Sequence, residues 1–143
     1  MKQHALARAV IVRDECVLLI QRSESEELAP GRWQCPAGTQ ETGETIEETL
    51  AREVHEETGL VVTARRPLGK TVSVLSRGGV KHEWTQHDFL AEARGHSVAL
   101  SEEHQAFEWK PIGEAARQGD LTPEARTALR RAIAAIRSGG GLD

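Results

Sequence analysis

Short apolar runs separated by polar turns predict β-strands in the first third of the chain. Residues 5–12 are apolar except for Arg8, and residues 16–20 are apolar again after a short polar interval, a pattern typical of a β-hairpin. Residues 33–35 are a further short candidate strand. That strand must end at Pro36, because proline has no N–H to donate to a ladder.

The apolar period changes from strand to helix in the next segment. Apolar residues recur at every fourth position and form one face of a helix, at Ile46, Leu50 and Val54. Thr45 and Glu48 have the spacing of a capping box, in which each side chain bonds to the other residue's backbone N–H. Gly59 marks the end, because glycine adopts the left-handed conformation that terminates helices. A helix between Thr45 and Gly59 is therefore predicted.

The second half of the chain predicts more strands and two further helices. The expected strands are residues 61–63, 68–75, 80–91 and 106–109, with a glycine turn at 76–79. The expected helices are residues 112–118 and 123–137, the second capped by Thr122, with a flexible tail at 138–143. This order predicts an α/β (α+β) fold with helices packed outside a mixed sheet, because a doubly wound parallel sheet needs strict alternation.

Length and composition indicate a single domain, spanning residues 1–143. The 18 basic and 22 acidic residues give a net charge of −4, and the sequence contains no block of basic residues. Both features argue against nucleic acid or a membrane surface as a partner. No apolar run approaches the roughly 20 residues needed to cross a bilayer, and the first residues lack the apolar stretch of a signal peptide. Cys16 and Cys35 are too few for a disulfide framework. We therefore expect a cytoplasmic protein with both thiols reduced and buried.

Three carboxylates share one side of the predicted helix. Glu53, Glu56 and Glu57 are three and four residues apart, so their side chains are neighbours on its surface. Without a counter-charge such a cluster repels itself, and three hard oxygen ligands suit a magnesium-like cation. A solvated acidic surface is the alternative, and we prefer it for Glu47 and Glu48.

Residues 38–60 also carry glycine, arginine and glutamate at fixed intervals. The set is Gly38, Glu44, Arg52, Glu53, Val54, Glu56, Glu57, Gly59 and Leu60. It resembles the signature of the Nudix hydrolases, G-x5-E-x7-R-E-U-x-E-E-x-G-U with U a bulky apolar residue, without a gap or mismatch. So many identities at fixed spacing are very improbable by chance. The resemblance implies a Nudix-type α/β/α sandwich with the loop–helix–loop motif at residues 38–60.

The resemblance also implies a metal centre. Glu56 and Glu57 are expected to be metal ligands, with Glu53 a further ligand or the group that orients the attacking water. A backbone carbonyl near Gly38 is expected to complete the protein ligands. The implied cofactor is Mg²⁺ or Mn²⁺, which neutralises charge on phosphate oxygens and lowers the pKa of bound water.

Further residues are assigned to catalysis by the resemblance. Arg52 is expected to hold the carboxylates in place, with Glu44 as its partner. Glu103 is expected to be an additional ligand or the catalytic base, and its neighbour Glu102 is the alternative. His104 is a candidate for assisting proton transfer, although a solvated or capping role is the more common one for such a histidine.

Three residues are candidates for substrate binding. Arg22 ends a predicted strand and is placed to meet a phosphate, with a surface role as the alternative. Trp33 and Trp84 are candidates for stacking on a base, with packing as the alternative for each.

The expected activity is metal-dependent hydrolysis of a phosphoanhydride bond in a nucleoside diphosphate linked to another group. The resemblance favours a nucleoside-triphosphate-like substrate, including a pterin triphosphate, over a dinucleoside polyphosphate of the diadenosine tetraphosphate type. A non-catalytic nucleotide-binding regulatory module is the alternative from another class, and the net charge argues against an RNA 5′ end as substrate. Many members of the family form homodimers. The C-terminal helix is a candidate interface, although packing on its own sheet explains its apolar stripe equally well.

Overall fold

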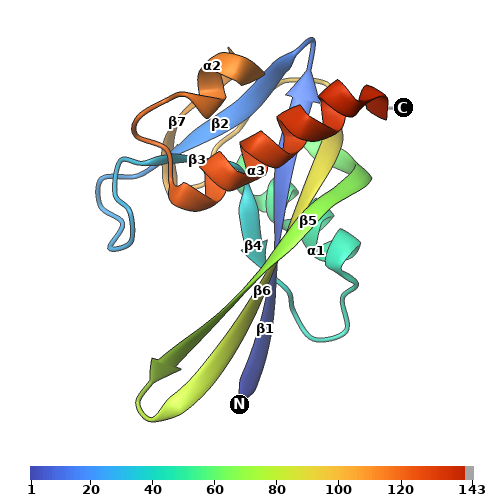
Figure 1. Cartoon of the computed structure of the whole chain (residues 1–143). Helices are drawn as coiled ribbons and strands as arrows, with labels where there is room; N and C mark the ends of the chain where they lie inside the picture. The colour runs from blue at the N-terminus through green and yellow to red at the C-terminus, as the bar shows by residue number, and fades with distance from the viewer. Residues whose placement is uncertain (141–143) are drawn as a thin grey trace.

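Seven strands form one mixed sheet in the computed structural model, which describes residues 1–140 (Figure 1). They are β1 (Lys2–Arg13), β2 (Cys16–Arg22), β3 (Trp33–Gln34), β4 (Ala37–Thr39), β5 (Val61–Arg77), β6 (Val80–Arg94) and β7 (His104–Pro111). The order is β3–β2–β1–β6–β5, with β4 pairing with β1 and β7 with β2. Strand β1 is parallel to β6 and antiparallel to β2 and β4, so it joins the two halves of the sheet.

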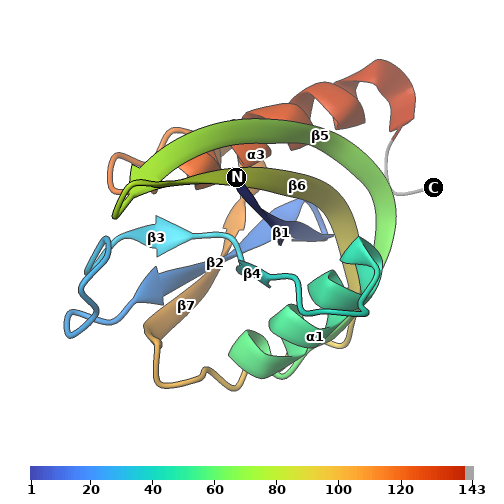
Figure 2. The same ribbon diagram turned by 90° about the horizontal axis from the view of Figure 1, so that it is seen from below.

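Alternation along the central strands directs side chains into two cores, one on each face of the sheet. On β1, Val10 belongs to one apolar cluster and Ile11 to the other. Helix α3 (Pro123–Ala135) covers the first cluster and α1 (Ile46–Thr58) covers the second. The two helices lie on opposite sides of the strands (Figure 2). This arrangement confirms the predicted α/β/α sandwich.

Helix α1 begins and ends where the sequence predicts. The Thr45 Oγ1 accepts a hydrogen bond from the Glu48 N–H at 3.1 Å, and the Glu48 carboxylate accepts one from the Thr45 N–H at 2.8 Å. Gly59 ends the helix with φ at 75°. Leu50 and Val54 are fully buried, so the apolar face anchors the helix and leaves its acidic side free for another use.

Helix α3 packs on its own sheet. The Thr122 side chain caps it and Pro123 occupies its first turn, as predicted. Ala125, Leu129 and Ala132 are fully buried in the core, so intramolecular packing accounts for its apolar stripe. Helix α2 (Ile112–Ala116) precedes it, and η1 (Ile136–Gly140) follows it with a kink at Gly139, where φ is 87°.

Strand β5 is the largest departure from the prediction. Two separate strands were expected, whereas one strand runs from Val61 to Arg77. Irregularities between Ala64 and Arg66 and between Pro67 and Gly69 allow the strand to pass the proline and the glycine that interrupt its pattern. The pairing with β6 therefore continues along its whole length.

Other boundaries also differ from the prediction. Strand β4 was not predicted, β1 begins at Lys2, β6 continues to Arg94, β7 already begins at His104, and α2 ends at Ala116. Cys35 is buried, but Cys16 is only half-buried, so the expectation that both are buried was wrong for Cys16. Residues 138–140 of the expected tail belong to η1, and residues 141–143 lie outside the described residues.

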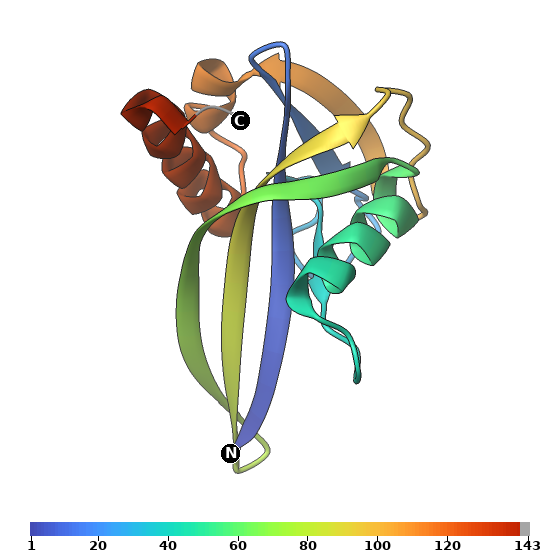
Figure 3. The same cartoon turned by 90° about the vertical axis from the view of Figure 1, so that its right-hand side faces the viewer.

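Strands β1, β5 and β6 extend together beyond the body of the fold, and the β5–β6 turn lies beside the N-terminus at their far end (Figure 3). This turn contains Gly78 and Gly79, which both have positive φ. Within residues 1–140, no helix combines the length and apolar character required to span a membrane.

Candidate active site

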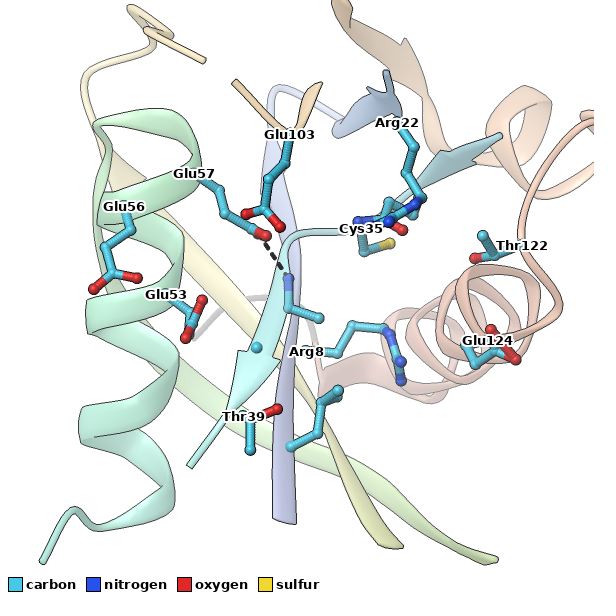
Figure 4. Close-up of a pocket in the computed structure, with 14 residues that line it drawn as sticks. Arg8, Arg22, Cys35, Thr39, Glu53, Glu56, Glu57, Glu103, Thr122 and Glu124 are labelled. Atoms are coloured by element: carbon cyan, nitrogen blue, oxygen red, sulfur yellow. Dashed lines mark hydrogen bonds between the residues drawn. The ribbon is translucent and has the colours of Figure 1, made fainter. Parts of the chain in front are cut away.

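The acidic side of α1 forms one wall of a cleft of about 440 Å³ (Figure 4). Glu53, Glu56 and Glu57 line this wall, and Glu103 joins them from the segment before β7. Glu124, in the first turn of α3, lines the far side. Four carboxylates from two distant parts of the sequence are thus brought to one side of a single cavity.

Strand β4 brings the backbone of Gly38 against Glu53. A Cβ atom placed on Gly38 would overlap the Glu53 carboxyl group. Only glycine therefore permits this approach, which gives a steric reason for the glycine that opens the motif.

Glu57 is the most buried of the motif carboxylates, with 6% of its surface exposed. Its Oε1 accepts a hydrogen bond from the Ala37 backbone N–H at 3.0 Å. Burial raises the pKa of this carboxyl group to about 8; the Ala37 hydrogen bond lowers it, and the charges of Glu53 and Glu103 raise it. A nearby cation would offset both the burial and the repulsion.

Arg52 links the supporting carboxylates. Its Nε donates to Glu44 Oε2 at 2.6 Å and its Nη2 to Glu44 Oε1 at 3.0 Å, a bidentate pair. Its Nη1 donates to Glu53 Oε1 at 2.8 Å and lies 3.3 Å from both carboxylate oxygens of Glu56. The hydrogen bond from Arg52 is the main reason why the pKa of Glu44 falls to about 2. Glu44 is therefore ionised near neutral pH and can fix the guanidinium that orients Glu53.

The donor set fits a hard divalent cation. Glu53, Glu56, Glu57 and Glu103 offer carboxylate oxygens. Because Gly38 has no side chain, its backbone lies directly against the Glu53 carboxyl group. Across residues 1–140, no three acidic, histidine or cysteine side chains converge closely enough to complete a metal site by themselves. A bound cation would thus also use oxygens of water and substrate, as Mg²⁺ commonly does.

Glu103 lies in the cleft with its backbone held in place. Its carbonyl accepts a hydrogen bond from the Ser23 N–H at 2.9 Å, which ties the segment to the end of β2. Glu102 is exposed and does not line the cleft. His104 is buried, and its Nε2 lies 3.0 Å from Nε2 of Gln34. Burial lowers the pKa of His104 to about 4, so this histidine is a neutral partner of Gln34 rather than a solvated group.

The three candidates for substrate binding lie in different surroundings. Arg22 lines the cleft, but its Nη2 donates to Glu26 at 3.2 Å and its Nε to a loop carbonyl at 2.7 Å. Trp33 packs against the apolar cluster beneath α3, which favours the packing interpretation. Trp84 lines an adjoining hollow and stacks on His4, with ring centroids 4.4 Å apart. A stacking role for Trp84 stays a prediction.

Two charged residues that line the cleft, Arg8 and Glu124, are absent from the sequence-based prediction, as is Asp88, the partner of Arg8. Arg8 lines the cleft, and its Nη1 donates to Asp88 Oδ1 at 2.9 Å. Arg8 and Asp88 are both buried. The available signal was the charge of Arg8 inside an apolar strand, but the sequence does not reveal a partner 80 residues away.

Known proteins share both the sequence pattern and the fold. The family model described as the NUDIX domain matches residues 3–132. The chain belongs to the Nudix family. The Nudix hydrolase YvcI of Bacillus subtilis is 28% identical over 111 residues, covering 76% of this chain and 66% of that protein. Human NUDT18, named as an 8-oxo-dGDP phosphatase, is 42% identical over 90 residues, covering 63% of this chain and 25% of that protein. The chain thus spans two thirds or less of the length of these curated relatives.

The solution structure of the Escherichia coli ORF135 protein resembles the whole fold. It matches with a TM-score of 0.79 and 25% identity, over 96% of this chain and 94% of that one. The comparisons confirm the family that the motif at residues 38–60 indicates.

Proposed function

We propose that this Nudix domain hydrolyses a phosphoanhydride bond in a nucleoside diphosphate linked to another group, with Mg²⁺ or Mn²⁺ as cofactor. The observation that carries the proposal is the contact between the start of the motif loop and the motif helix. Glu53 lies against Gly38, and Glu57 is bonded to Ala37, so loop and helix form one carboxylate-lined wall.

The residues divide the chemical tasks among themselves. Glu53, Glu56 and Glu57 would hold the cation, while Arg52 and Glu44 keep Glu53 in its orientation. A divalent cation supplies neutralisation of the phosphate oxygens and a lowered pKa for water. Water then attacks one phosphorus, the bridging P–O bond breaks, and a carboxylate in the cleft accepts the proton. Two phosphorylated fragments leave.

The preferred substrate is a nucleoside-triphosphate-like molecule. The resemblance of residues 32–34 to Nudix pyrophosphatases of triphosphates supports it, whereas residues 100–106 resemble both these enzymes and the diadenosine tetraphosphate hydrolases. The cleft of about 440 Å³ is in the range of pockets that take small ligands. The name of NUDT18 refers to a nucleoside diphosphate, so diphosphates belong in the same screen. A dinucleoside polyphosphate is the alternative substrate.

A substrate screen with product identification tests the proposal. The protein is incubated with Mg²⁺ and a panel of nucleoside di- and triphosphates, a pterin triphosphate and diadenosine tetraphosphate, and products are resolved by ion chromatography. Glu57→Gln should reduce turnover by at least about 100-fold. Glu47→Gln, which removes an exposed carboxylate from the same helix, is the matched control and should keep full activity.

The proposal fails if no compound turns over or if Glu57→Gln is as active as the parent protein. Binding of nucleotide without metal-dependent turnover would instead support the regulatory-module alternative. A much larger kcat/KM for diadenosine tetraphosphate than for any triphosphate would reverse the preferred substrate order.

A further inference from the structure

A group of three charges, in which Arg8 and Asp88 are buried and Arg131 is partly exposed, lies beside the cleft. Asp88, with 2% of its surface exposed, accepts a hydrogen bond on each carboxylate oxygen. Arg8 Nη1 donates to Oδ1 at 2.9 Å, and Arg131 Nη1 donates to Oδ2 at 2.8 Å. The second amino group of Arg8 donates to Gln86 Oε1 at 2.7 Å. Both guanidinium groups are thus held in fixed orientations.

Strand alternation places this group on the α3 side of the sheet. Arg8 is two residues before Val10, which lies in the core beneath α3, and it is paired with Asp88 across β1 and β6. Arg131 reaches Asp88 from α3 itself and also donates to Thr71 on β5. Side chains from two separate elements, β1 and α3, therefore converge on one carboxylate of β6.

The group has a surplus positive charge. Two guanidinium groups and one carboxylate, +2 and −1, leave a net charge of +1. Burying a charged group costs free energy unless it is compensated. Asp88 carries one negative charge and bonds to both cations, the buried Arg8 and the partly exposed Arg131, so it does not neutralise both. Arg22, the other cation at the cleft, is already paired with Glu26. The surplus is therefore associated with the Arg8 group.

Arg8 faces the cavity from the side opposite the acidic helix. Its side chain lines the cleft and extends between the α1 glutamates and the start of α3 (Figure 4). Its backbone lies opposite Ala37 in the β1–β4 ladder, next to the segment that holds Glu57. The described residues form two hydrogen bonds with its five N–H groups, so further donors remain for a ligand.

We propose that Arg8 binds a phosphate group of the substrate, on the side of the cleft opposite the glutamates that would hold the metal. Asp88 and Arg131 are positioning residues: they fix the guanidinium and maintain its surplus charge. The identity of the ligand rests on the proposed function. A guanidinium is suited to this task because its planar fork matches phosphate oxygens and it remains charged when partly dehydrated.

The choice of a phosphate over a nucleobase follows from charge. A base edge can be read by neutral donors, whereas a fixed net positive charge favours an anion. A polyphosphate beside four glutamates needs positive charge on its side remote from the metal. The surplus charge of the Arg8 group meets that requirement.

Binding of imidodiphosphate, a non-hydrolysable pyrophosphate analogue that contains no base, tests the proposal by calorimetry in the presence of Mg²⁺. Arg8→Met should raise its Kd by about tenfold to a hundredfold, the range of one charge-assisted hydrogen bond. Arg8→Lys should recover part of the loss, because it restores the charge but not the fork. The Kd of the unphosphorylated nucleoside of the best substrate should be the same in both variants as in the parent protein.

Arg131→Met tests whether the net charge of the Arg8, Asp88 and Arg131 group affects binding without changing a residue that contacts the ligand. Arg131 does not line the cleft, yet its removal leaves the pair of Arg8 and Asp88 neutral. The Kd of imidodiphosphate should rise by about three- to tenfold, and its dependence on salt concentration should weaken. Arg130→Met removes an exposed charge from the same helix and is the matched control, with no expected change.

The outcomes are distinct from those of the activity screen. Unchanged imidodiphosphate binding in Arg8→Met, absent binding in the parent protein, or a selective loss of nucleoside binding would each overturn the inference. Thermal unfolding establishes whether each variant is folded. If Arg8→Met is not folded, the Kd values of imidodiphosphate for Arg8→Lys and Arg131→Met decide whether the inference holds. Binding that depends on Arg8 without turnover of any nucleotide would refute the proposed hydrolysis while leaving this inference intact. In an active enzyme, KM should rise in Arg8→Met while kcat changes less than about threefold.

Discussion

The carboxyl group of Glu53 occupies the space that a side chain on Gly38 would need. Helix and strand are therefore fitted to one another at the point where the motif begins. Because Arg52 also holds Glu53 at 2.8 Å, the carboxylate is fixed from two directions. Close control of this one group is what hydrolysis at a metal requires, since small displacements of a catalytic group cost large factors in rate.

Gly38→Ala should displace Glu53 and lower kcat by about 100-fold, because a misplacement of about 1 Å has an effect of that size. Steady-state kinetics with the best substrate of the screen measures the loss. Gly119→Ala is the control, since a Cβ there meets open space and the variant should retain full activity. Equal activity of the two variants would show that Glu53 does not need this approach.

Glu44→Gln should lower activity by about 10- to 100-fold, the usual cost of removing a residue that orients a metal ligand. The pKa of Glu44 is lowered from 4.5 to about 2, so its ionised form is favoured in the folded protein. The stabilisation of the folded protein by ionised Glu44 is complete above the pKa of 4.5 that the group has in the unfolded chain. It is lost only as the pH falls toward 2. The ratio of parent to variant activity should therefore be constant from about pH 6 to about pH 9.

Glu41→Gln is the matched control for Glu44→Gln. Glu41 lies 3.7 Å from Arg52 but is largely exposed, so its removal should change activity less than about threefold. A defect in Glu44→Gln that varied strongly with pH over this range would contradict the assigned pairing with Arg52.

Glu57→Gln should stabilise the metal-free protein and abolish its stabilisation by Mg²⁺. Burial raises the pKa of Glu57 from 4.5 to about 8, so near neutral pH the metal-free protein must take up a proton to fold, at a cost in stability. A neutral amide of the same shape avoids that cost while still accepting from Ala37. In the parent protein, Mg²⁺ at a hundredfold excess over its Kd should add about 2.7 kcal/mol. Thermal unfolding with and without Mg²⁺ measures both effects. A full Mg²⁺ shift in Glu57→Gln would exclude Glu57 as a ligand.

The motif helix could be predicted because every signal for it is local. The apolar period, the Thr45–Glu48 capping box and Gly59 all lie within one short segment, and each agrees with the others. Strand β5 was divided in error because Arg65 and Arg66 interrupt the apolar pattern and Pro67, a usual strand breaker, follows them. Irregularities in its pairing with β6, which depend on the partner strand, allow the strand to continue.

The charged group of Arg8, Asp88 and Arg131 could not be predicted for a different reason. Its members come from β1, β6 and α3, and their contact depends on the parallel pairing of β1 with β6. A single sequence marks Arg8 as unusual inside an apolar strand but does not identify its partners. The burial of Glu57 was equally inaccessible, because it depends on β4, a strand too short to be recognised.

Cys35 should resist alkylation in the folded protein, whereas Cys16 should react. Burial raises the pKa of the Cys35 thiol to about 12, so at about pH 8 the thiolate is about one part in ten thousand. Cys16 is half-buried. Mass spectrometry after iodoacetamide treatment should find one adduct in the native protein and two after denaturation. Cys35 also lines the cleft, so a native adduct on Cys35 in a Cys16→Ser variant would show that this part of the cleft opens.

Glu103→Gln should lower kcat by about 100-fold without changing the Kd of Mg²⁺, because we expect Glu103 to accept the proton from water. Its backbone is held by Ser23 at the end of β2, so its carboxylate enters the cleft from a fixed position next to Glu57 (Figure 4). Glu102→Gln, at the exposed neighbouring position, is the control and should leave kcat unchanged. Pre-steady-state kinetics and a Mg²⁺ titration separate the two roles. A higher Kd for Mg²⁺ in Glu103→Gln would make Glu103 a ligand and leave Glu53 as the base.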